Sequence, residues 1–82
     1  MSEQSGNVRA LVEQIAKALV DEPEQVSVNQ VDGATTVLEL TVAEKDVGKV
    51  IGRSGRVARA LRSLLHATGV RANKRFELEI LE

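Results

Sequence analysis

The stretch VIGRSGRVARAL at residues 50–61 decides how this 82-residue chain can fold. Two glycines three residues apart, Gly52 and Gly55, separate an apolar pair from a segment whose apolar residues recur at helical spacing. Glycine tolerates positive φ and lets a backbone approach closely, so the pattern predicts two helices joined by a tight loop. The alternative interpretation of the loop is an ordinary helix-turn-helix corner in which both glycines are only caps.

Upstream of the loop, the chain predicts a helix and a β-hairpin. Asn7 is the candidate N-cap of a helix of about fourteen residues, preceded by a polar tail over residues 1–6. Pro23 should end this helix, because the residue before proline is pushed out of the helical region. The apolar positions of the helix form one stripe: Val8, Leu11, Val12, Ile15 and Leu19.

The predicted hairpin has one buried face. Val26 and Val28 alternate with polar residues, Asp32-Gly33 offers a turn that can take positive φ, and a strand follows at residues 36–42. On that second strand the alternation predicts that Leu38, Leu40 and Val42 face the core.

Around and after the loop, two helices and a last strand are expected. A short helix covers about residues 44–51, with Glu44 and Asp46 at its positive end. A longer helix covers about residues 56–67, and Gly69 is its expected C-cap. The inward positions of the longer helix should be Val57, Leu61, Leu64 and Leu65. The last strand is expected at residues 75–81.

The element order helix, strand, strand, helix, helix, strand predicts an α+β fold. A strand joined to a later strand through helices favours a parallel neighbour and a right-handed crossover. We therefore expect one domain over residues 7–82, with a three-stranded mixed sheet and all three helices on one face.

Charge is distributed unevenly along the chain, although its net value is only -1. Residues 47–76 contain eight bases and no acid, whereas residues 1–46 contain nine acids and three bases. Such a block suggests a surface that binds polyanions. The alternative is a set of solvated helix arginines with no ligand.

A phosphate group would fit the glycine loop. The following helix presents unpaired N–H groups and its positive dipole end there, and Arg53 and Ser54 should point outward. Beside the loop, an apolar shelf for bases is expected from Val47, Val50 and Val57. Phosphates held on one side and bases on the other describe binding to an unpaired nucleic-acid strand.

On these residues the sequence resembles the KH domains, and in its element order the bacterial type II arrangement. An apolar pair, G-x-x-G and an amphipathic helix are typical of that family, and the stretch DVGKVIG at residues 46–52 is similar to the small bacterial KhpA family. The resemblance implies that Gly52, Arg53, Ser54 and Gly55 form the RNA loop, flanked by Lys49 and Arg56. Together with the apolar shelf and the next arginine of the basic helix, the full set of predicted RNA contacts is Val47, Lys49, Val50, Ile51, Gly52, Arg53, Ser54, Gly55, Arg56, Val57 and Arg59.

The same resemblance implies the biology that follows. It implies a cytoplasmic RNA chaperone that binds single-stranded RNA, forms homodimers, pairs with a second KH protein, KhpB, and is linked to cell-envelope growth and cell length. The lack of cysteine fits a reducing compartment. The first residues do not resemble a secretory signal, and no apolar run reaches the roughly 20 residues of a membrane span.

Several alternatives stay open. A dimerising scaffold with little RNA binding of its own is one, and single-stranded DNA as the ligand is another. Arg62 is either a contact or a solvated residue, and His66 is expected at the surface. We expect no enzyme, cofactor, metal site, membrane contact or small-molecule substrate, because no nucleophile-base pair, metal cluster or Walker loop is recognisable.

Overall fold

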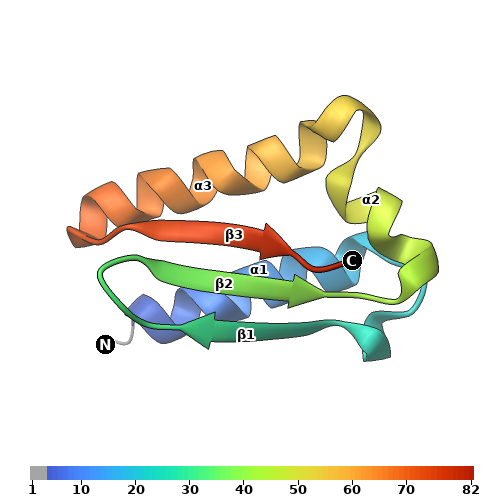
Figure 1. Ribbon diagram of the computed structural model, residues 1–82, viewed down its shortest axis with the longest axis horizontal. Helices are drawn as coiled ribbons and strands as arrows, with labels where there is room; N and C mark the ends of the chain where they lie inside the picture. The colour runs from blue at the N-terminus through green and yellow to red at the C-terminus, as the bar shows by residue number, and fades with distance from the viewer. Residues whose placement is uncertain (1–3) are drawn as a thin grey trace.

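The structure, a computed structural model, describes residues 4–82. In chain order its helices and strands are α1 (Gln4–Leu19), β1 (Ser27–Val31), β2 (Thr36–Thr41), α2 (Val47–Ile51), α3 (Arg56–Ala72) and β3 (Phe76–Ile80). Single turns of 3₁₀ helix lie at Pro23–Gln25, Glu44–Asp46 and Arg53–Gly55. Six principal elements thus follow the expected order, with the glycine loop between α2 and α3 (Figure 1).

The three strands form one mixed sheet in the order β1-β2-β3. β1 runs antiparallel to β2, with Val28 opposite Leu40. β3 runs parallel to β2, with Leu78 beside Leu38. The parallel pair requires a crossover, and α2, the loop and α3 provide it (Figure 1).

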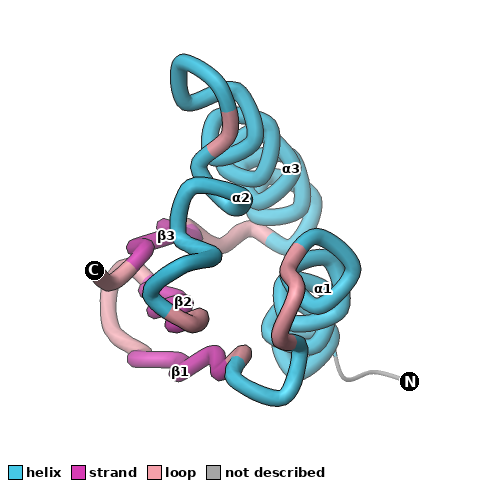
Figure 2. Tube along the Cα trace, turned by 90° about the vertical axis from the view of Figure 1, so that its right-hand side faces the viewer, coloured by secondary structure: helices cyan, strands magenta, loops and turns pink. Residues whose placement is uncertain are grey.

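All three helices lie on one face of the sheet (Figure 2). Alternate strand residues turn toward them and are buried, with the central β2 contributing Leu38 and Leu40 at 0% exposure. The helices supply the other half of this core through Val8, Val12, Ala16, Val50, Leu61 and Leu65. The expected α+β fold with a three-stranded mixed sheet is confirmed.

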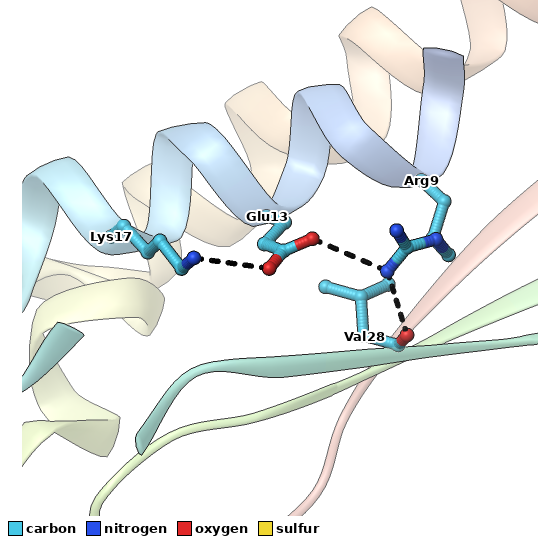
Figure 3. Close-up of polar contacts among 4 residues, drawn as sticks. All are labelled: Arg9, Glu13, Lys17 and Val28. Atoms are coloured by element: carbon cyan, nitrogen blue, oxygen red, sulfur yellow. Dashed lines mark hydrogen bonds and ion pairs between the residues drawn. The ribbon is translucent and has the colours of Figure 1, made fainter. Parts of the chain in front are cut away.

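Polar contacts also hold α1 against β1 (Figure 3). The Arg9 guanidinium donates a hydrogen bond to the Val28 carbonyl at 3.3 Å and pairs with Glu13 at 3.2 Å. Lys17 pairs with the same carboxylate at 3.1 Å, and this bond from Lys17 lowers the pKa of Glu13. The helix is therefore fixed at its solvent side as well as through its apolar stripe.

Two expectations about the first half of the chain are wrong. The first helix already includes Gln4, so Asn7 lies inside it and is not its N-cap. The hairpin turn extends over residues 32–35, and Gly33 is not in the left-handed region, because a four-residue connection does not need the positive φ of a two-residue turn. Of the α1 stripe, Leu11 and Leu19 are partly exposed.

Helix α3 is longer than its sequence pattern suggests. It continues to Ala72 and ends at Asn73, which takes the left-handed conformation with φ 57°. Gly69 is therefore not the cap. It is buried inside the helix, where an added Cβ would lie 2.5 Å from the Lys74 carbonyl oxygen. Leu64, expected to face inward, is 50% exposed.

Among residues 4–82, no helix is both long and apolar enough to cross a membrane.

Candidate nucleic-acid interface

The loop between α2 and α3 contains three residues with positive φ. Gly52 has φ 80°, Ser54 has φ 57° and Gly55 has φ 76°. Hydrogen bonds from the Gly52 N–H to the Gly48 carbonyl (2.8 Å) and from the Gly55 N–H to the Gly52 carbonyl (3.0 Å) fix the turn. Non-glycine residues rarely adopt positive φ, so Ser54 occupies a conformation that its neighbours must hold in place.

Close packing explains the first glycine. A Cβ on Gly52 would lie 2.5 Å from Cγ2 of Val57 and 2.8 Å from its backbone nitrogen. Nothing lies within 4 Å of a Cβ on Gly55, so only its positive φ favours glycine there. The loop thus sits directly on the first turn of α3.

Two backbone donors of the loop are unused. Within residues 4–82, neither the Arg53 nor the Ser54 N–H makes a hydrogen bond to another protein group. They lie at the N-terminus of α3, a seventeen-residue helix whose dipole adds positive potential. Neighbouring free N–H groups in a left-handed turn at a helix start form a concavity suited to an anion.

Basic side chains surround these donors. Arg53, Ser54 and Arg56 are exposed, as expected. Arg59 behaves differently, because its guanidinium Nη2 reaches back to donate to the Ser54 carbonyl at 3.1 Å. Arg59 therefore both adds positive charge beside the loop and braces the strained Ser54.

The Lys49 side chain is paired with two aspartates. Its ammonium lies 3.4 Å from Asp21 Oδ2 and 3.7 Å from Asp46 Oδ1. Lys49 is therefore tied to the connection between α1 and β1, and its charge near the loop is partly neutralised.

Asp46 is a structural residue that the sequence pattern did not reveal. It is 0% exposed, and its Oδ2 accepts a hydrogen bond from the Glu22 N–H at 3.1 Å. Burial raises its pKa, but backbone N–H bonds from Asp21 and Glu22 and the charges of Lys49 and Lys45 outweigh it, so the pKa is lowered overall. An acid at a helix start ordinarily suggests a solvated dipole partner, and only the tertiary contact shows that this one anchors α2.

The expected apolar shelf is only partly present. Val50 is 0% exposed and belongs to the core, so the expectation that it contacts a base is wrong. Ile51 and Val57 are half-buried beside the loop. Val47 instead lines a shallow hollow together with Thr41, Val42, Glu44, Leu81 and Glu82. The carboxylates of Glu44 and Glu82 make this hollow unsuited to phosphate.

A second hollow lies between α3 and β3, and sequence reasoning missed it. Its lining consists of Arg62, His66, Phe76, Glu77 and Leu78. Arg62 is exposed and donates from Nη2 to the Leu78 carbonyl at 3.4 Å, so its guanidinium lies against β3. The i, i+3 spacing of Arg56, Arg59 and Arg62 hinted at one basic side of α3, but it could not place β3 beside it.

Comparison with known proteins identifies this arrangement. The sequence model of the family described as "KhpA/KhpB, KH domain" matches residues 9–80, and so includes the whole loop and both its helices. The chain belongs to this family. The match agrees with the type II KH fold seen in the structure. In this fold α1 and β1 come first in the chain, and β2, α2, the glycine loop, α3 and β3 follow.

Individual members of the KhpA/KhpB family are similar over nearly their full lengths. "RNA-binding protein KhpA" of Borreliella burgdorferi is 50% identical over 78 residues, which cover 94% of this chain and 95% of the relative. The protein of the same name from Clostridium perfringens is 48% identical, with 90% and 100% covered. The one from Aquifex aeolicus is 49% identical, with 92% and 96% covered.

A solved structure shares the fold alone. A crystal structure of Aquifex aeolicus Era bound to GDP.AlF4- superposes with a TM-score of 0.59 at 19% sequence identity, covering 89% of this chain and 29% of that one.

Proposed function

We propose that this chain binds single-stranded RNA, with a phosphate seated at the free N–H groups of Arg53 and Ser54. That pair of unused donors at the start of α3 is the observation that carries the proposal. Anions bind helix N-termini through such groups, and KH loops clamp about four backbone nucleotides. The "RNA-binding" names of the relatives that cover 90% or more of this chain support the same ligand.

The candidate contacts differ in weight. Gly52, Arg53, Ser54, Gly55 and Arg56 form the phosphate grip itself. Ile51, Val57 and Arg59 border it, through apolar surface and one guanidinium. Lys49 and Val47 are outer contacts, since one is paired with acids and the other faces a hollow that contains two glutamates.

The proposed chaperone role, protein partners and cellular role rest on membership of the family. Holding unpaired RNA without chemistry suits an RNA chaperone, a protein that keeps strands from mispairing. Only Phe76 is aromatic and it is 8% exposed, so no stacking platform strengthens the grip. A homodimer, or a pair with KhpB, would add avidity. Action in the cytoplasm, with a link to cell-envelope growth and cell length, completes the proposal.

The test is fluorescence anisotropy of a labelled unstructured RNA with the variant Arg53→Asp, Ser54→Asp. Two acids beside the free N–H groups should repel phosphate and weaken binding by at least about tenfold, since several backbone contacts are lost together. The matched control is Arg71→Asp, Ser27→Asp, which makes the same change of three charges. Arg71 lies at the far end of α3, about 24 Å along the helix from Gly55.

Two outcomes distinguish an RNA-binding loop from a purely structural one. A folded loop variant that binds weakly, beside a control that binds like wild type and an affinity that falls with salt, supports the RNA grip. Equal binding by both variants would leave the loop a structural corner and favour the dimerising scaffold. A matched DNA oligonucleotide in the same assay tells RNA from DNA as the ligand.

A further inference from the structure

The concavity formed by the free N–H groups depends on the backbone conformation of Ser54. Within the turn Arg53–Gly55 the sign of φ changes, because Arg53 has a negative φ and Ser54 has φ 57° with ψ 25°. Such a turn directs successive N–H groups into one concavity, as in the backbone nests that bind anions. If Ser54 relaxed to a negative φ, the two donors would no longer converge on one phosphate.

Serine does not hold this conformation by preference. Gly52 and Gly55, on either side, also have positive φ, and glycine accepts it without steric cost. A residue with a Cβ persists in the left-handed region only where contacts around it keep it there. The Ser54 side chain is exposed, so packing in the core does not supply those contacts.

Arg59 supplies a contact of the required kind. Its Nη2 donates to the Ser54 carbonyl oxygen at 3.1 Å. The direction of this carbonyl follows from the φ and ψ of Ser54, so a bond that fixes the carbonyl also restrains both angles. A hydrogen bond from a charged donor is stronger than one between neutral groups. Arg59 lies within α3, and the helix therefore anchors the group that restrains the loop.

We propose that Arg59 is a positioning residue of the loop, which raises RNA affinity by holding Ser54 left-handed and not by its own contact with a phosphate. The proposal rests on the proposed RNA binding. Because the bond is made within the protein, the N–H groups converge without help from the ligand. Less ordering of the loop is then needed on binding, which favours affinity.

The test is a double-mutant cycle between Arg59→Met and Ser54→Gly. Glycine adopts positive φ without strain, so Ser54→Gly should make the bond from Arg59 unnecessary. The Kd for a labelled RNA octamer of uridine is measured by fluorescence anisotropy. Arg59→Met alone should weaken binding about three- to tenfold, the range of one net hydrogen bond. Added to Ser54→Gly, it should weaken binding by less than about twofold, the remainder due to lost charge.

Arg56→Met is the matched control. Arg56 is exposed on the first turn of the same helix, and its replacement removes the same charge. As a direct contact, it should weaken binding by the same factor with or without Ser54→Gly. It should also make the dependence of log affinity on log salt shallower by about 0.7, the value for one phosphate contact on a single strand. Arg59→Met should leave that dependence unchanged.

Each result has a distinct meaning. A loss caused by Arg59→Met that largely disappears beside Ser54→Gly, while the loss from Arg56→Met persists, supports the proposal. An equal loss from Arg59→Met in both backgrounds, or no loss in either, overturns it while RNA binding stands. A wild type that does not bind the octamer refutes the proposed function itself. If the methionine variant does not fold, Arg59→Lys keeps the charge without the planar guanidinium and is judged by the same cycle.

Discussion

Gly52 is the residue on which the loop depends most directly. Its φ of 80° and the 2.5 Å approach of a Cβ to Val57 exclude a side chain for two separate reasons. Gly48, four residues earlier, has nothing within 4 Å of an added Cβ and lies in α2. The two glycines therefore differ in what they do, although both look alike in the sequence.

Gly52→Ala should destabilise the protein by at least about 2 kcal/mol, because a backbone at φ 80° and ψ 170° costs a residue other than glycine roughly 1–3 kcal/mol and the clash adds to it. Gly48→Ala should be neutral or stabilising by up to about 1 kcal/mol, since alanine favours a helix. Urea unfolding followed by circular dichroism measures both. Similar free energies of unfolding for the two variants would contradict the role given to Gly52.

Sequence reasoning at the residue scale succeeded where a residue's backbone conformation decided its role. Positive φ at Gly52 could be predicted from its place at the end of a helix. Gly55 was expected to allow a close backbone approach, but nothing lies within 4 Å of an added Cβ there, and its positive φ is what favours glycine. The burial of Val50 and the exposure of Leu64 could not, because helical periodicity gives a face but not how far the neighbouring element covers it. The need for glycine at position 69 could not be predicted either. It arises from the Lys74 carbonyl oxygen, which lies where a Cβ would be, and the geometry of the turn that places this carbonyl cannot be derived from the sequence.

At the scale of elements, α2 is held by the buried side chain of Val50 and by a buried carboxylate at its start. Only five residues long, α2 cannot be stable through its own hydrogen bonds. Asp46 ties its start to the Glu22 backbone, and Lys49 bridges Asp46 to Asp21. The element before the loop is therefore positioned by contacts from the α1–β1 connection.

The stability of the protein should fall in acid partly through Asp46. Its folded-state pKa is held below its ordinary value near 3.8 by backbone N–H bonds and lysines, despite opposing burial. A lowered pKa stabilises the fold fully above the unfolded pKa, and the contribution disappears as pH falls through the folded pKa. Free energies of unfolding from pH 7 to pH 2 should therefore decline less steeply in Asp46→Asn than in wild type.

The control for this measurement is Asp32→Asn, a change of an exposed aspartate in the β1–β2 turn. It should leave the pH profile parallel to wild type. An Asp46→Asn profile that also runs parallel to wild type would mean that this carboxylate does not stabilise the fold through its charge.

Element order was the level at which the sequence was most informative. Periodicity of two for the strands and of three to four for the helices predicted all six principal elements and their topology. The ends were harder to predict: α1 begins before Asn7 and α3 passes Gly69 to end at Asn73. The start of α1 consists of polar residues, where apolar periodicity gives no signal, and α3 continues through Gly69, a residue that the sequence pattern treats as a cap.

Considered as a whole, the molecule separates its charges. The bases of residues 47–76 lie on α2, the loop, α3 and the turn that follows it. The helix-free face of the sheet carries Glu39, Glu77 and Glu79, with Glu39 and Glu79 side by side in register. A polyanion should therefore be attracted to one side and repelled from the other, even though the net charge is close to zero.

The most direct test of the RNA grip is an NMR titration of ¹⁵N-labelled protein with the RNA octamer of uridine, U8, observed through the backbone amide signals. The free N–H groups of Arg53 and Ser54 should show the largest shifts, followed by the first turn of α3, while β1 and the acidic face remain unchanged. Shifts centred on the sheet, or none at the loop in a sample that binds U8, would contradict the account.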